Sequence, residues 1–172
     1  MLSFGFILFV TLFRLLPHPA NLTPMGAVAV LSGRKMPLGL ALATALGAML
    51  LSDMLLSRVY GYPAFSSVSL FVYAAFGLQA LISRGLRSFA RGHYYAAVLG
   101  ASSFFVVTNL GVWLSGWYPP TLDGLLTCYT MALPFFQMTL VGDLLWTGIL
   151  ALGLDKLSSL QKPAPLPLAS HA

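Results

Sequence analysis

The sequence contains very few charged residues and no glutamate. Only 8% of its 172 residues are charged, and all four acidic residues are aspartates. Soluble domains carry roughly a quarter charged residues. Because 58% of the residues are hydrophobic, so little charge could not keep the surface in water. The chain is therefore predicted to be an integral membrane protein.

Motifs of known chemistry are also missing. The single cysteine, Cys128, excludes an internal disulfide and a metal site built from several cysteines. The sequence shows no Ser/His/Asp order, no glycine-rich phosphate loop and no histidine cluster with metal-ligand spacing. We therefore predict that the protein is not an enzyme and that it uses no metal and no cofactor.

The basic residues carry information about topology. A net charge of +5 would suit nucleic acid in a soluble protein, but here the basic residues lie at the ends of apolar runs. That placement is typical of membrane topology. The predicted partner is therefore the lipid bilayer and not nucleic acid.

Five apolar runs are long enough, or nearly so, to cross a hydrocarbon core, which needs about 20 residues. Two shorter apolar stretches, 20–33 and 121–133, remain. As a helix the first of these would reach only about 20 Å. It is thus either a short span or a segment that dips in and returns. The five longer runs cover roughly 2–16, 37–56, 66–83, 93–115 and 135–155.

The distribution of charge decides between these possibilities. If 20–33 crosses and 121–133 stays outside, seven of the nine basic residues face the cytoplasm, leaving Arg14 and Arg58 outside. If 20–33 dips in and returns, the basic run 84–91 faces outward, which the positive-inside rule disfavours. The crossing arrangement is therefore the predicted one.

The predicted fold is an all-α, six-helix transmembrane bundle over residues 1–157 with both termini in the cytoplasm. The stretch 121–133 is expected to form a short outer loop helix before the last span. Residues 158–172 are rich in proline and are predicted to be a disordered cytoplasmic tail.

Asp143 is the strongest candidate for a functional residue, because an acidic side chain inside a membrane span is costly. It lies about 12 Å below the outer end of the last span. Trp146 and Thr147 follow on the same helical face. The residue could act on a solute, or it could be a protonated or ion-paired aspartate that only locks helices together.

Asp143 is predicted to lie within hydrogen-bonding reach, directly or through ligand or water, of at least one of three outer groups: Arg14, Asn109 and the N-terminal end of the helix over 20–33. Thr23 and Pro24 resemble the N-cap and first residue of that helix. Free N–H groups there would suit an anionic or carbonyl-bearing group. Asn109 could equally be an amide that only joins helices.

Two further features have competing interpretations. Arg14 and Asp53 lie at similar depth near the outer ends of their spans, so a structural salt bridge between them is expected. Cys128 could be a metal or corrinoid ligand, although a lone cysteine is more often a small buried hydrophobic residue.

Three strings of the sequence resemble a known family. They are Arg14-Leu-Leu-Pro-His-Pro-Ala-Asn-Leu-Thr-Pro24, Thr108-Asn109-Leu-Gly-Val-Trp113, and Cys128-Tyr-Thr-Met-Ala-Leu-Pro-Phe-Phe136 followed by Gly142-Asp143-Leu. In order and type they resemble an uncharacterised family of small bacterial inner-membrane proteins catalogued as transport proteins. That family in turn looks like the substrate-binding S components of energy-coupling-factor (ECF) vitamin transporters.

The resemblance implies six helices, cytoplasmic termini and a ligand captured from the outer side. It also implies an energy-coupling ATPase module as a partner. The first span lacks the Ala-x-x-x-Ala motif with which such S components often dock, so solitary operation stays open.

We therefore predict a substrate-binding transport protein of the bacterial inner membrane. It would capture a small organic solute, such as a vitamin or related cofactor precursor, in an outer-facing cavity. The alternatives are a structural or assembly subunit without a ligand, and a corrinoid-handling membrane protein that uses Cys128. The residues predicted to contact the solute or shape its site are Arg14, Asn21, Asn109, Trp113, Tyr129, Asp143 and Trp146.

Overall fold

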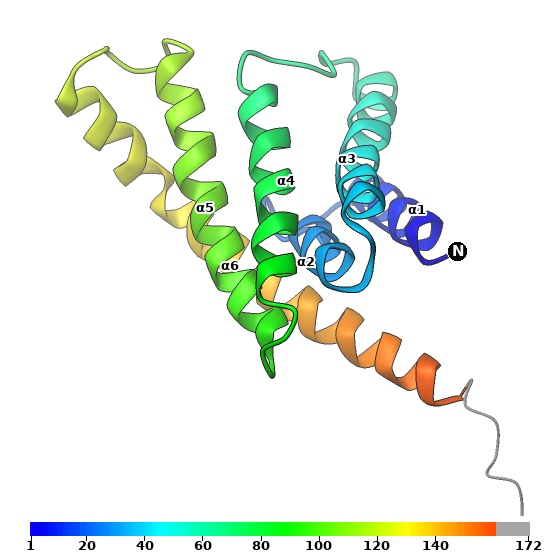
Figure 1. Cartoon of the computed structure of the whole chain (residues 1–172). Helices are drawn as coiled ribbons and strands as arrows, with labels where there is room; N and C mark the ends of the chain where they lie inside the picture. The colour runs from blue at the N-terminus through cyan, green and yellow to red at the C-terminus, as the bar shows by residue number, and fades with distance from the viewer. Residues whose placement is uncertain (161–172) are drawn as a thin grey trace, which may run out of the picture.

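The computed structural model describes residues 1–160, and over these residues it contains six helices and no strand (Figure 1). The prediction of an all-α fold is therefore confirmed. The disordered tail was predicted to begin at residue 158, but residues 158–160 are still helical; the rest of the predicted tail lies outside the described residues. The helices are α1 (Leu2–Leu15), α2 (Met25–Lys35), α3 (Leu38–Tyr60), α4 (Ser69–Gly85), α5 (Gly92–Leu114) and α6 (Leu122–Leu160).

The short helix α2 lies at the centre of the bundle. It contacts each of the other five helices, and its nine residues from Met25 to Gly33 are all buried. The backbone of α4 comes so close that a β-carbon on Gly33 would overlap the carbonyl group of Ala80. Ser83 Oγ of α4 also donates to the carbonyl oxygen of Val30 at 2.6 Å. Because α2 is enclosed on all sides, its sequence is apolar without a polar face.

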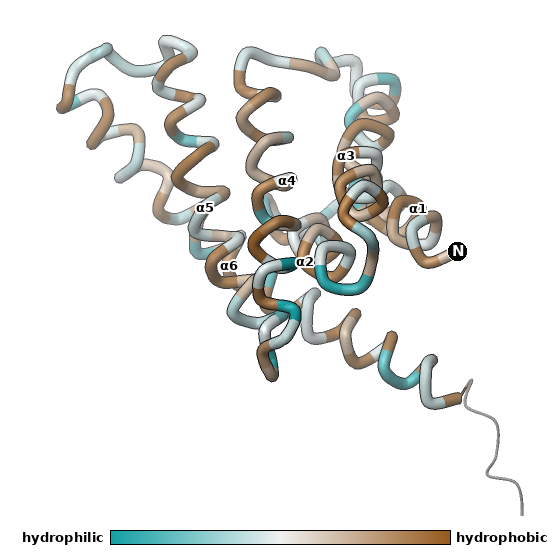
Figure 2. The backbone as a smooth tube through the Cα atoms, viewed as in Figure 1, coloured by the Kyte–Doolittle hydropathy of each residue, from teal (hydrophilic) through white to brown (hydrophobic). Residues whose placement is uncertain are grey.

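Three helices, α3, α5 and α6, are long and apolar enough to cross a membrane. α1 is apolar but shorter. At 1.5 Å per residue, α2 measures about 16 Å and α4 about 26 Å, less than the roughly 30 Å of a hydrocarbon core. Many large apolar side chains of the helices are exposed. Hydrophobic residues, brown in Figure 2, recur along the helices. This gives the chain the character of a membrane protein, although three of the six predicted spans are shorter than the hydrocarbon core.

The predicted loop helix over 121–133 is not a separate element. It is the first third of α6, which runs for 39 residues and contains Pro134. A proline in a helix removes one backbone donor and crowds the preceding turn, but its fixed φ angle is helical. Apolar residues continue on both sides of Pro134, so the helix passes through it instead of ending there. The expectation of a break before the last span was therefore wrong.

Basic residues gather at one end of the bundle. Arg34 donates to two carbonyl groups of the turn between α4 and α5, and Arg84 donates to the carbonyl oxygen of Met36 between α2 and α3. Lys35 Nζ lies 3.5 Å from Asp155 Oδ1 of α6. The ends of α2 and α4 and the later part of α6 thus meet at this end.

The N-terminus lies at the same end. α1 runs alongside α3 in the same direction: the hydroxyl groups of Ser3 and Thr44 are 2.6 Å apart near the start of both helices. Arg14 reaches Asp53 toward their far ends. The segments 16–24, 61–68 and 115–121 connect the helices at the opposite end.

Candidate functional site

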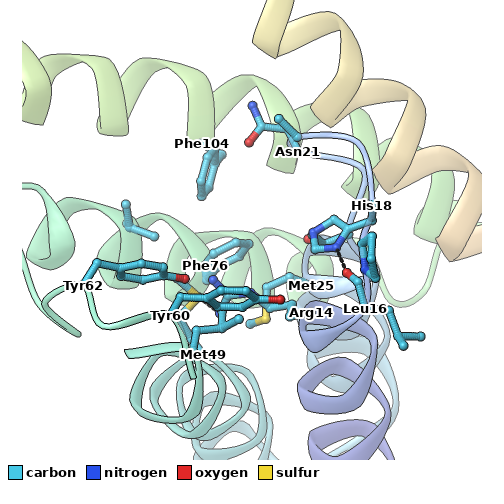
Figure 3. Close-up of a pocket in the computed structure, with 15 residues that line it drawn as sticks. Arg14, Leu16, His18, Asn21, Met25, Met49, Tyr60, Tyr62, Phe76 and Phe104 are labelled. Carbon is cyan, nitrogen blue, oxygen red and sulfur yellow. Dashed lines mark hydrogen bonds between the residues drawn. The ribbon is translucent and has the colours of Figure 1, made fainter. Parts of the chain in front are cut away.

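A cavity of about 630 Å³ opens at the end of the bundle opposite the basic residues. The connection 16–24 forms one side of it, and α3, α4 and α5 contribute the others (Figure 3). The rings of Tyr60 and Tyr62 lie parallel on one side, with centroids 6.2 Å apart. Further lining residues include Arg14, His18, Asn21, Thr23, Met25, Met49, Val72, Phe76 and Phe104.

Two smaller hollows share walls with this cavity. One, of about 300 Å³, lies between α4, α5 and α6 and includes Asn109 and Thr139. The other is a recess of about 40 Å³ lined by Gly26 and Asp143 among others. Asn21 and Phe104 line all three spaces. The three spaces therefore adjoin one another.

Arg14 is held by α3. Its Nη1 atom lies 2.9 Å from Asp53 Oδ1, and it also donates to Ser52 Oγ. Asp53 Oδ2 accepts a further hydrogen bond of 3.0 Å from the hydroxyl group of Tyr73 on α4. The expected pair of Arg14 and Asp53 thus forms in the structure. Arg14 still lines the cavity, but Asp53 balances its charge.

Asp143 lies at the floor of the site and is only 4% exposed. Its Oδ2 atom accepts a hydrogen bond of 2.7 Å from Gln79 Nε2. The carboxyl group occupies the space beside Gly26, where a β-carbon would overlap it. Within residues 1–160, neither Arg14 nor Asn109 forms a hydrogen bond with it. Asp143 thus lies beside the N-terminal end of α2, one of the three groups named in the prediction, but the hydrogen bond that it receives in the described structure comes from Gln79.

The start of α2 differs from the expected cap. The helix begins at Met25, one residue later than predicted, and no side chain caps it. The first intrahelical bond runs from Val28 N to Pro24 O at 3.0 Å. The N–H groups of the first turn therefore have no acceptor within the helix. These groups give the end of α2 a partial positive charge beside Asp143.

Gln79 was missed by the sequence analysis. Its side chain is fully buried, and it lies so close to α5 that a β-carbon on Gly100 would overlap it. Its Oε1 atom has no hydrogen-bond partner in the described part of the chain. The signal was available, because an amide in the apolar run 66–83 is as unusual as Asn109 in the next one.

The segment 16–24 is anchored on α6. Asn21 has a left-handed backbone (φ 63°), which asparagine tolerates better than most residues. Its Nδ2 atom donates to the carbonyl oxygen of Phe135 at 3.4 Å. Trp146 Nε1 donates to the carbonyl oxygen of Leu22 at 3.4 Å, and its ring packs edge-on against Phe13. Asn21 therefore lines the site as predicted, whereas Trp146 supports the segment from behind and lines none of the described cavities.

The remaining predicted residues are spread over the half of the bundle that contains the cavity. Asn109 lines the 300 Å³ hollow but donates to the carbonyl oxygen of Phe105 in its own helix at 2.8 Å. Trp113 lies in a separate aromatic pocket with Leu114 and residues 116–120. Tyr129 joins α6 to α5 through a bond of 2.7 Å to the carbonyl oxygen of Val106. Neither Trp113 nor Tyr129 lines the central cavity.

Cys128 is buried between α5 and α6, where its Sγ atom lies 3.5 Å from the carbonyl oxygen of Asn109. It lines none of the described cavities. Among residues 1–160, no three His, Cys, Asp or Glu side chains come together to hold a metal ion.

Comparison with known proteins gives one match. The sequence matches the family DUF6580, described as a family of unknown function, over residues 1–164. No curated protein and no solved structure is similar enough to the chain to count as a match. The match includes every helix and cavity described above. The chain therefore belongs to the DUF6580 family, whose function is unknown.

Proposed function

We propose that this protein is a substrate-binding membrane transport protein that captures a small organic solute in the cavity beside segment 16–24. The observation that carries the proposal is the cavity itself. Its volume of about 630 Å³ falls within the roughly 300–1,000 Å³ of small-molecule sites. Its wall combines apolar and aromatic side chains with a few polar groups, and the adjoining recess of about 40 Å³ contains the buried carboxyl group of Asp143.

The proposed topology has six membrane segments in the bacterial inner membrane, with both termini in the cytoplasm. Its support is the gathering of Arg34, Lys35 and Arg84 at one end of the bundle, as the positive-inside rule requires. The cavity then faces outward. The short helix α2 covers only part of the crossing in this topology, and the non-helical segment 16–24 completes it. Non-helical backbone is tolerated at membrane depth where it is enclosed by protein or lines a cavity. Segment 16–24 lines a cavity and packs on α6.

An energy-coupling ATPase module is a proposed partner of the same transport function, although α1 lacks the small-residue motif expected for docking. A purely structural subunit would be expected to fill its interior with mutually satisfied groups. The adjoining cavities favour a ligand-binding role over that alternative. Cys128 lies outside the cavities, so the corrinoid alternative gains no support from its position.

Blocking the cavity tests the proposal. Val72 lines both the 630 Å³ and the 300 Å³ spaces, so the indole ring of Val72→Trp should obstruct both. Native mass spectrometry should detect a small molecule retained by the purified wild-type protein and lost from this variant. Leu70→Trp is the matched control, because Leu70 lies on the same helix and is 76% exposed. Equal retention by the two variants, or no retained molecule and no uptake by the wild type, would contradict the proposed function.

Reporter fusions test the topology. Leu86 follows α4 at the basic end, and Asp123 lies in the first turn of α6 at the opposite end. A fusion after Leu86 should report a cytoplasmic position, and one after Asp123 should report an external position. If both reporters lie on one side, the outward-facing cavity is ruled out.

A further inference from the structure

The charge of Asp143 is not balanced by any basic side chain in residues 1–160. The two salt bridges of this region join Arg14 to Asp53 and Lys35 to Asp155. Asp143 receives one hydrogen bond, from the neutral amide of Gln79. Its Oδ1 atom accepts none in the described structure, and Asp143 lines the 40 Å³ recess beside Gly26. A buried carboxylate without a cationic partner is costly, so this group requires a proton or a cation.

The other charged groups at the cavity do not change this balance. Arg14 is neutralised by Asp53, which also accepts a bond from Tyr73. His18 Nδ1 bonds the carbonyl oxygen of Leu16 at 2.7 Å, which uses one ring nitrogen as a donor (Figure 3). Asp143 is therefore the one acidic group at these spaces without a basic partner in the described part of the chain.

The N-terminal end of α2 does not offer a free anion site. Its partial positive charge faces the carboxyl group of Asp143, which already fills the space at Gly26. An anionic group on a solute would meet this carboxyl group first. The sequence-based expectation of an anionic or carbonyl-bearing ligand at this helix end is therefore not favoured.

The wall above the recess suits a cation. Phe76 and Phe104 line both the large cavity and the recess, and their ring centroids are 4.8 Å apart. Tyr60 and Tyr62 add two further rings at the large cavity. Aromatic faces attract organic cations, more strongly when water is excluded.

We propose that the cavity binds a small organic cation whose protonated amine enters the recess and pairs with Asp143. The inference rests on the proposed function and specifies the solute class. The amine supplies the positive charge that Asp143 lacks. The organic part of the solute occupies the larger space between Tyr60, Phe76 and Phe104. A recess of about 40 Å³ has room for a group the size of one water molecule, which an ammonium group matches.

A matched series of probes tests the solute class on the full-length protein in detergent. The probes are 2-phenylethylammonium, the neutral 2-phenylethanol and the anionic phenylacetate, with binding measured by calorimetry and by the shift in melting temperature. The ammonium probe should bind most tightly to the wild type. Asp143→Asn keeps size and hydrogen bonding but removes the charge, and it should weaken that binding at least about tenfold. Asp123→Asn is the control, since Asp123 is exposed at the outer end of α6, and it should bind like the wild type.

The outcomes separate this inference from the proposed function. Tighter binding of phenylacetate than of the ammonium probe, or equal binding of that probe by wild type and Asp143→Asn, overturns the cation assignment. Failure of the ammonium probe to bind at millimolar concentration also overturns it. A retained native solute that carries a carboxylate and no amine would end the cation assignment but support the transport function.

Discussion

Gly26→Ala is expected to destabilise the protein, although alanine is the better helix former. A β-carbon at this position would overlap the carboxyl group of Asp143, so either the carboxyl group leaves Gln79 or α2 shifts within the bundle. Overpacking of a close-packed interior typically costs about 1–3 kcal/mol, and occasionally more. Thermal unfolding of the purified protein in detergent should show a clearly lower melting temperature.

Two comparisons isolate the cause of this effect. Gly5→Ala in α1 is the matched control, because no atom lies within 4 Å of the added β-carbon, and it should be neutral or slightly stabilising. In an Asp143→Ala background the carboxyl group is gone, so Gly26→Ala should cost little. If Gly26→Ala leaves the stability unchanged in the wild-type background as well as in the Asp143→Ala background, the contact between Gly26 and Asp143 is disproved.

Gln79→Leu should produce the second large effect. The substitution removes the one hydrogen-bond donor that Asp143 has in the described structure and leaves the carboxyl group buried. An unsatisfied buried polar group costs about 1–3 kcal/mol, and more when it is charged. The expected result is a lower melting temperature.

The same substitution at Gln137 provides the control. Gln137 lies exposed on α6, so Gln137→Leu should leave the melting temperature nearly unchanged. In an Asp143→Ala background, Gln79→Leu should cost much less than in the wild type, because no carboxyl group remains to be satisfied. A cost that is the same in both backgrounds would show that Gln79 acts through packing against Gly100 and not through its bond to Asp143.

Asp143 could act as a helix lock or as a solute-binding residue, and measurements on Asp143→Asn distinguish these two roles. If the residue acts only as a lock, the cost of Asp143→Asn should appear as lost stability that accounts for any lost binding. If it holds a solute, the variant should fold normally and lose affinity. The bond to Gln79 contributes to stability in either case, so stability and binding must be measured on the same sample.

The sequence by itself determined the membrane character of the chain and its helical secondary structure. Long apolar runs with little charge favour helices in a membrane, because only hydrogen bonding within the segment satisfies the backbone there. The low charge also made Asp143 stand out, since an acid in an apolar run has few explanations. Basic residues at the ends of the apolar runs predicted that Arg34, Arg84 and the end of the last helix would lie at the same end of the bundle. The structure brings them together there.

Only the tertiary structure decided which side chains meet. Gln79 and Asp143 are 64 residues apart, and nothing local in the sequence indicates that α4 presents its amide to α6. The placement depends on glycines at 26 and 100, which leave room for these side chains between packed helices. The same packing moves Trp146 and Tyr129 out of the cavity, where they hold neighbouring backbone instead. Helical periodicity fixes the face of a residue on its own helix, but the neighbour on that face is set by how closely the helices can approach.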